Sequence, residues 1–174
     1  MSTWQDFVAA IDVSSPMTTA TKHISDLCSI VEGKQWTILE VGNHMGYSAA
    51  ALALAAPEST VTAVDLCDTV QQCTRVDYWA SVGVTNIQPV ASPAINFLAG
   101  CVPGGFDFIF HDAVHGPAAF SEYMGFADVA SKVLAIHDFE QIDTAMQDAV
   151  KAKFASFTED ADHIGRVLFV GYKQ

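Results

Sequence analysis

The sequence predicts an α/β protein with a doubly wound, mostly parallel sheet of seven strands, helices on both faces and a C-terminal antiparallel hairpin. Two observations support this fold class. Between residue 36 and about residue 153, short apolar runs alternate with helical segments, which is the pattern of βαβ units. The runs contain few polar residues, as is typical of strands buried on both faces of a sheet. The last two runs have no helix between them, so we expect them to pair as a hairpin.

The first 33 residues are predicted to be helical, because apolar residues recur there at helical spacing. These residues are Trp4, Phe7, Val8 and Ile11 in a first segment, and Ile24, Leu27, Cys28 and Val31 in a second. The second segment is expected to begin at Pro16 and to end at Gly33, since proline often starts a helix and glycine often ends one.

Glycine and proline residues separate the elements that follow. Strands are expected at residues 36–41, 60–64, 86–91, 106–110, 133–136, 154–158 and 166–172, and helices at residues 46–56, 68–82, 93–98, 117–130 and 142–153. Gly42 bounds the first strand, Pro57 stops the helix after it and Gly83 ends the next helix. The acidic stretch at residues 159–165, with Glu159, Asp160 and Asp162, is interpreted as a solvated turn between the last two strands.

Composition excludes several functional classes. The length of 174 residues is typical of a single domain, and 51% hydrophobic against 16% charged residues excludes intrinsic disorder. A formal net charge of −12 repels phosphate backbones, so we expect neither nucleic acid nor a membrane as partner. Residues 1–12 carry acids and no basic n-region, and no apolar run reaches bilayer length. We therefore expect a cytoplasmic protein that binds a small molecule.

Polar residues concentrate directly after the predicted strands, where ligands bind in open α/β sheets. Gly42 and Gly46 allow the backbone to approach a ligand and turn into a helix. Their spacing differs from dinucleotide and phosphate-loop motifs, and no lysine follows to hold a phosphate. Glu40 suits a cation, whereas Asp65 can accept hydrogen bonds from two ribose hydroxyls. A cationic ribose nucleoside without phosphate, such as S-adenosylmethionine (SAM), matches both acids.

Structural interpretations of the same residues remain open. The two glycines could serve only a tight turn, and Asp65 could be a helix N-cap, a position that aspartate favours. His111 and His137, at the ends of two predicted strands, are interpreted as parts of the scaffold.

These motifs together resemble those of class I SAM-dependent methyltransferases, and within them small-molecule O-methyltransferases of the catechol type and of the bacterial sugar type. The resemblance is carried by residues 38–42 with 46–49, Val64-Asp65, Ala91-Ser92, residues 106–112 and residues 136–138. They follow one another in the family's order between residues 36 and 140. The resemblance implies a Rossmann-like methyltransferase fold in one domain, with a helical cap at residues 1–33 and a cofactor-binding core at 34–174.

The resemblance also implies a role for each matching residue. Glu40 and Gly42 would hold the methionine part of SAM, with Ser48 close to its carboxylate. Asp65 would bind the ribose, and Leu66 would pack on the adenine. The remaining residues of the predicted cofactor site are Ser92 at the adenine edge, Asn43, His44, Gly46, Tyr47 and Asp112.

Asp112 and Asp138 fall where metal-dependent members of the family place two ligands for Mg²⁺, a cation that prefers oxygen ligands. Those members have an amide directly after the second carboxylate, whereas this chain has Phe139. His115 stands at the position of the catechol type's catalytic lysine, where a histidine is familiar in the sugar type. The predicted catalytic residues are His115 and Asp112, with either His115 as base or Mg²⁺ lowering the acceptor's pKa. In the structural alternative, Asp112, Asp138 and His115 only stabilise the fold.

The predicted function is therefore methyl transfer from SAM to a small hydroxylated molecule. A non-catalytic SAM-binding or regulatory protein is an alternative, because the amide and a substrate-capping insertion are missing. A hydroxylase is another, because the His-Asp pair also occurs in relatives of this fold that are described as hydroxylases. Without such an insertion, the N-terminal helices or a second subunit would have to cover the substrate. A homodimer is expected if the N-terminal apolar stripe is exposed.

Overall fold

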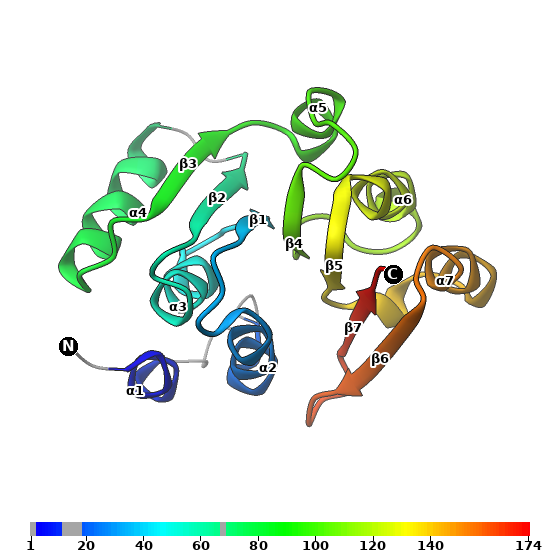
Figure 1. The fold of residues 1–174 in the computed structure, drawn as a ribbon, viewed down its shortest axis with the longest axis horizontal. Helices are drawn as coiled ribbons and strands as arrows, with labels where there is room; N and C mark the ends of the chain where they lie inside the picture. Colours follow the sequence, from blue (N-terminus) through cyan, green and yellow to red (C-terminus); the bar gives the residue numbers. More distant parts are fainter. Residues whose placement is uncertain (1–2, 12–18, 67–68) are drawn as a thin grey trace.

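The computed structural model describes residues 3–11, 19–66 and 69–174, and a seven-stranded sheet forms its centre (Figure 1). The strands are β1 (Thr37–Val41), β2 (Thr60–Asp65), β3 (Ile87–Ala91), β4 (Phe106–His111), β5 (Ala130–Ile136), β6 (Ser156–Ala161) and β7 (Val167–Tyr172). Their order is β3-β2-β1-β4-β5-β7-β6. The first five are parallel, and β7 runs antiparallel to both β5 and β6. The mostly parallel sheet and the C-terminal hairpin are thus confirmed.

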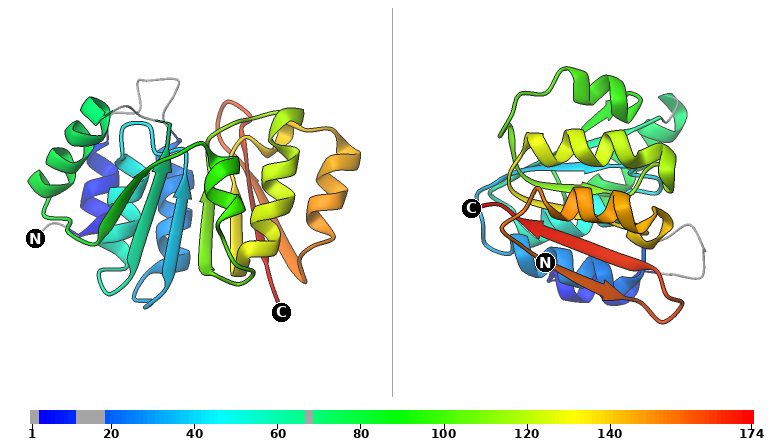
Figure 2. Two further views of the ribbon diagram at one scale, coloured as in Figure 1. Left: turned by 90° about the horizontal axis from the view of Figure 1, so that it is seen from above. Right: turned by 90° about the vertical axis from the view of Figure 1, so that its right-hand side faces the viewer.

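Helices cover both faces of this sheet (Figure 2). One face carries α1 (Trp4–Ala10), α2 (Thr21–Val31), α3 (Tyr47–Ala55) and α4 (Thr69–Ser81), and the other carries α5 (Ala94–Ala99), α6 (Phe120–Val129) and α7 (Thr144–Lys151). Short 3-10 turns at Pro117–Ala119 and Phe139–Gln141 precede α6 and α7. The arrangement confirms the doubly wound α/β class.

Two hydrophobic cores lie on the two sides of the sheet. Ile38 and Phe108 face the α2–α3 side, whereas their neighbours Leu39 and Ile109 face the α6 side, and all four are fully buried. Successive side chains of a strand point to opposite faces, so a strand covered on both sides must be apolar throughout. The nearly unbroken apolar runs of the sequence have this origin.

Several element boundaries differ from the sequence-based expectation. β5 begins at Ala130, three residues before the predicted start, and takes the end of the segment predicted as helix. The helix expected from residue 142 begins at Thr144, because the Asp143 side chain accepts a hydrogen bond from the Met146 amide at 2.8 Å. The starts predicted at Pro16 and at residue 68 lie outside the described residues.

The N-terminal helices belong to the layer that covers the sheet. The apolar stripe of α2 is buried inside the chain, where it packs with the alanine-rich helix α3. In α1, Trp4 and Phe7 are only partly buried against the same core, and the expected homodimer stays a prediction. The division into a helical cap and a core stays a prediction. No helix within the described ranges is both long enough and apolar enough to cross a bilayer.

Candidate active site

A cavity of about 510 Å³ lies at the carboxyl edge of the parallel strands. It is next to the point where the strand order reverses between β1 and β4, the place where open α/β sheets bind ligands. Its lining residues are Thr19, Val41, Gly42, His44, Val64, Asp65, Leu66, Arg75, Ser92, Pro93, Ala94, Asp112, Ala113, Val114, His115, Glu122, His137, Asp138 and Arg166. Residues that follow all five parallel strands therefore meet in one cavity.

The first part of this cavity, which we name the Asp65 end, consists of Asp65, Leu66, Arg75 and Ser92. The Asp65 carboxylate accepts hydrogen bonds from the His44 amide at 2.6 Å and from the Arg75 guanidinium at 3.0 Å. The Ser92 amide donates to the Asp65 carbonyl at 2.9 Å, so the β2–β3 ladder continues into the cavity wall. Leu66 is exposed and offers an apolar surface beside the carboxylate. Three predicted nucleoside-binding residues are thus brought together.

Two glycines shape the loop between β1 and α3, and each is required by a contact within the chain. Gly42 has a φ of +91°, and a Cβ there would lie 2.2 Å from the carbonyl oxygen of Asp112. Gly46 has a φ of +81°, and a Cβ there would lie 2.7 Å from the Trp79 indole nitrogen, which donates a hydrogen bond to the Gly46 carbonyl at 2.9 Å. Gly42 lines the cavity, whereas Gly46 faces Trp79 of α4.

Glu40 lies beneath this loop and outside the cavity lining. It is fully buried, and its two carboxylate oxygens accept hydrogen bonds from the Ser48 hydroxyl and, at 2.6 Å, from the Asn43 amide. Burial raises the pKa of Glu40 to about 8, against the opposing effect of these hydrogen bonds. Of the two acids predicted to frame the cofactor, the structure places only Asp65 against the cavity. Glu40, Asn43 and Ser48 form a buried hydrogen-bonded group beneath the loop, and their roles toward the cofactor stay predictions.

Tyr47 lies in a second cavity of about 310 Å³, beside the first. Its ring packs edge-to-face on Tyr78 of α4, with 5.4 Å between the ring centroids. His44 and Arg75 line both cavities, so they form part of the wall between them.

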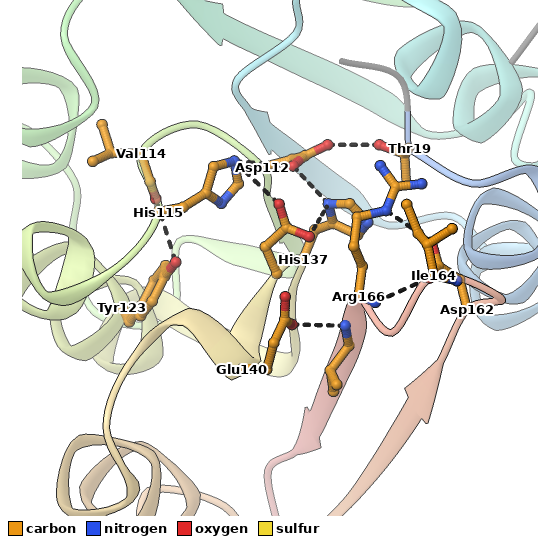
Figure 3. A network of polar contacts seen from close by, with 12 residues as sticks. Thr19, Asp112, Val114, His115, Tyr123, His137, Glu140, Asp162, Ile164 and Arg166 are labelled. Atoms are coloured by element: carbon orange, nitrogen blue, oxygen red, sulfur yellow. Dashed lines mark hydrogen bonds and ion pairs between the residues drawn. The ribbon is translucent and has the colours of Figure 1, made fainter. Parts of the chain in front are cut away.

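The opposite part of the main cavity, the Asp112 end, consists of Asp112, His115, His137 and Asp138 (Figure 3). Asp112 Oδ2 accepts a hydrogen bond from the Thr19 hydroxyl at 2.6 Å, and Oδ1 lies 3.0 Å from His137 Nδ1. Burial alone would raise the pKa of Asp112, but the hydrogen bond and charge of His137 hold it below its ordinary value. The same contact raises the pKa of His137 despite its burial. His137, interpreted from sequence as scaffold, is thus part of this cluster.

His115 reaches both carboxylates of the Asp112 end. Its Nε2 lies 3.7 Å from Asp112 Oδ1 and 3.8 Å from Asp138 Oδ2, and its side chain is 28% exposed (Figure 3). An imidazole in this position can meet a ligand in the cavity and accept a proton from it. The predicted catalytic residues His115 and Asp112 therefore lie side by side.

The donor set does not fit the predicted Mg²⁺ site. Both oxygens of Asp112 already contact protein donors. Phe139, at the position of the family's amide ligand, is buried and stacks on Phe169 at 4.5 Å. Within the described parts of the chain, no three His, Cys, Asp or Glu side chains form a group that could hold a metal. Asp112 and Asp138 are thus partnered by histidines.

Four polar or charged lining residues were not singled out from the sequence, namely Thr19, Arg75, Glu122 and Arg166. Glu122 on α6 lies 2.8 Å from the buried His111 ring, which fixes the orientation of its carboxylate. Thr19, Arg75 and Glu122 meet partners that are 93, 10 and 11 residues away along the chain, and only the fold brings these pairs together. Arg166 instead pairs with Asp162, four residues before it.

The turn between β6 and β7 corrects one interpretation. The Asp162 side chain is only 1% exposed rather than solvated, and it accepts hydrogen bonds from the Ile164 and Arg166 amides and from the Arg166 guanidinium. Burial opposes ionisation, but these donors lower the pKa of Asp162 to about 2. The turn thereby holds Arg166 against the cavity (Figure 3).

Solved structures share this fold at low sequence identity. The O-methyltransferase TomG from Streptomyces achromogenes, involved in tomaymycin synthesis and in complex with SAM, has a TM-score of 0.70 and 16% identity over 91% of this chain and 82% of its own. Precorrin-6y C5,15-methyltransferase from Geobacter metallireducens has a TM-score of 0.68 and 10% identity over 95% of both chains. Cofactor-bound Rv0187 from MTB has a TM-score of 0.68 and 18% identity over 98% of this chain and 87% of its own.

The search of curated proteins gives no match to this sequence. The sequence model of a family described as O-methyltransferase, in contrast, matches residues 2–146, which is well over half of the chain. This match includes β1 to β5 and all the strand-end residues that line the cavity. The chain therefore belongs to the O-methyltransferase family.

Proposed function

We propose that this protein is a SAM-dependent methyltransferase that methylates a hydroxyl group of a small molecule. The observation that carries the proposal is that a single cavity joins the Asp65 end to the Asp112 end. The first end offers a carboxylate and apolar surface suited to a nucleoside, and the second offers an imidazole between two carboxylates. Membership of the O-methyltransferase family and the SAM bound to TomG support the same conclusion.

In this proposal the Asp65 end holds the nucleoside part of SAM. Asp65 accepts hydrogen bonds from the ribose hydroxyls, while Leu66 and Ser92 contact the adenine. Glu40 acts indirectly, because it holds Ser48 and Asn43 and so fixes the loop that carries Gly42. When bound, SAM supplies a methyl group on a sulfonium, which an oxygen nucleophile takes by in-line displacement.

At the Asp112 end, His115 removes the proton of the acceptor hydroxyl. The positive charge that develops on the imidazole is stabilised by Asp112 and Asp138, each less than 4 Å from Nε2. Thr19 and His137 fix the Asp112 carboxylate, so it needs no reorganisation during the reaction. Proton transfer of this kind contributes about 10²- to 10⁴-fold to a rate. Because the donor set does not fit Mg²⁺, the proposed mechanism uses none.

The proposed acceptor is a small molecule, and we propose neither a nucleic acid nor a membrane as partner of this chain. The formal net charge of −12 would repel phosphate groups.

Calorimetry with SAM and with S-adenosylhomocysteine (SAH) tests the cofactor part of the proposal. We expect both to bind the wild type, and the matched variant Asp65→Asn to bind them about 100-fold more weakly, because ribose hydroxyls would lose an ionised acceptor. Absence of binding to the wild type would refute the proposed function.

A turnover assay then tests the reaction. SAH formation is measured with a panel of small hydroxylated compounds, once with Mg²⁺ and once with EDTA. We expect turnover on at least one compound, with equal rates in the two arms. A rate that collapses in EDTA contradicts the metal-free mechanism, and binding without turnover on the panel favours the non-catalytic alternative.

A further inference from the structure

The Arg75 side chain lies in the wall between the two cavities and contacts the Asp65 carboxylate, which faces the larger cavity. It belongs to α4 and follows Asp65 by ten positions. Its side chain is 10% exposed and that of Asp65 is 20% exposed, so the pair is largely shielded from water. An ion pair in this setting is screened less by solvent than a surface pair.

The contacts of Asp65 define the plane of its carboxylate. The Arg75 guanidinium approaches Oδ2 from α4, and the His44 amide approaches the same oxygen from the loop after β1. Two donors from separate segments at one oxygen fix the direction in which the other oxygen points. Outer partners of this kind commonly orient the group that contacts a ligand.

We propose that Arg75 is a positioning residue that sets Asp65 to receive the ribose of the cofactor. This inference rests on the proposed function, since it assumes that the cavity binds an adenosyl compound. Arg75 itself need not touch the nucleoside. Its effect passes through Asp65, and a preorganised carboxylate binds without an entropic cost of ordering.

The experiment compares SAH affinities by calorimetry in the wild type, Arg75→Met, Arg75→Lys, Asp65→Asn and the double variant. Methionine keeps the wall between the cavities filled but lacks the charge and the donors. We expect Arg75→Met to weaken SAH binding about 10-fold, and Arg75→Lys to recover most of that loss because an ammonium can still reach the carboxylate. Lys153→Met, which removes a 2.9 Å surface contact with Asp128, is the control and should bind as the wild type does.

The double variant distinguishes positioning from a general structural effect. If Arg75 acts through Asp65, Arg75→Met should add less than about twofold in the Asp65→Asn background. A full 10-fold loss in that background, or unchanged affinity of Arg75→Met alone, would overturn the inference. Wild-type protein that binds no SAH would instead refute the proposed function, and the inference with it.

A second measurement tests directly how much the ribose hydroxyls contribute to binding. Adenosine and 2′,3′-dideoxyadenosine are compared as competitors of SAH in the wild type and in Arg75→Met. The wild type should prefer adenosine. The variant should lose most of that preference, because an Asp65 carboxylate that is no longer held in one orientation forms weaker hydrogen bonds with the ribose hydroxyls. An undiminished preference in the variant would contradict the positioning role.

Discussion

The two ends of the cavity hold their carboxylates by different means. Asp65 is fixed by a backbone amide and by a guanidinium, which stays charged at all physiological pH values. Asp112 is fixed by a hydroxyl and by an imidazole, a group whose charge changes near neutral pH. The difference is consistent with the proposed division of roles, in which the Asp65 end binds the nucleoside and the Asp112 end transfers a proton.

The largest expected effect concerns the Asp112 end alone. His115→Gln removes the proposed base, so we expect turnover to fall about 10²- to 10⁴-fold. SAM affinity should stay within about twofold of the wild type, because the Asp65 end is untouched. SAH formation and calorimetry measure the two quantities separately. Turnover at the wild-type rate would remove His115 from the mechanism, and an equal loss of SAM affinity would show that the two ends do not act separately.

The second prediction concerns the close approach between the loop after β1 and the Asp112 end. Gly42→Ala places a Cβ against the Asp112 carbonyl and strains a backbone with φ of +91°, so we expect a loss of about 3 kcal/mol in free energy of unfolding. The matched control is Gly33→Ala, where φ is +66° and no atom lies within 4 Å of the added Cβ. It should cost only about 1 kcal/mol. Equal losses in urea unfolding would contradict the proposed clash.

The third prediction concerns the support beneath the loop. The pKa of Glu40 is about 8 in the fold against an ordinary value of 4.5, so between these values the unfolded chain binds fewer protons. The contribution of Glu40 to stability is therefore present below pH 4.5 and falls as pH rises through 8. Between pH 6 and pH 8 the loss is about 2 kcal/mol. In Glu40→Gln this loss should disappear, since an amide does not titrate.

Urea unfolding of both proteins at the two pH values measures the effect as a difference. Other groups titrate in the same range, but they do so in both proteins and cancel. Parallel pH curves for the wild type and Glu40→Gln would show that Glu40 is ionised throughout this range.

The smallest expected effect concerns the hydrogen bond from Thr19 to Asp112 at the Asp112 end. Thr19→Val removes the hydroxyl donor to Asp112 and keeps the side-chain volume, so we expect a loss of about 1 kcal/mol in free energy of unfolding. The pKa of Asp112 should rise, because one donor to its charged form is lost. Carboxyl NMR shifts measure that pKa. The control is Thr158→Val at an exposed position of β6. An unchanged Asp112 pKa in Thr19→Val would show that the Thr19 hydroxyl does not stabilise the charged form of Asp112.

Much of the fold was predictable because the evidence for it is local. The apolar runs and their glycine and proline boundaries identified seven strands, and the missing helix before β7 identified the hairpin. Boundaries failed where local pattern and pairing compete: β5 begins at Ala130 because it pairs with Phe106 of β4. The point where a strand begins or ends depends on the strand with which it pairs, and the periodicity of the sequence carries no information about that pairing.

The candidate site was predictable as a set of positions rather than as a set of contacts. Strand-end residues such as Asp65, Asp112 and His115 do line one cavity, because parallel strands end at the same edge. Arg75 and Thr19 escaped notice, since a helix residue and a residue before a helix have no strand-end position. Asp162 was misread because charge runs usually mark solvated turns.

By itself the sequence determined which residues stand at the tips of neighbouring strands, since side-chain alternation and turn residues act over a few positions. Only the tertiary structure decided what those residues face. Glu40 and Asp65 lie near the carboxyl ends of two adjacent strands, where Glu40 pairs with Ala63, two residues before Asp65. Yet Glu40 is enclosed beneath a loop, whereas Asp65 opens on a cavity. The physical reason is distance along the chain: Asp112 meets a hydroxyl 93 residues away, and only packing brings such groups together.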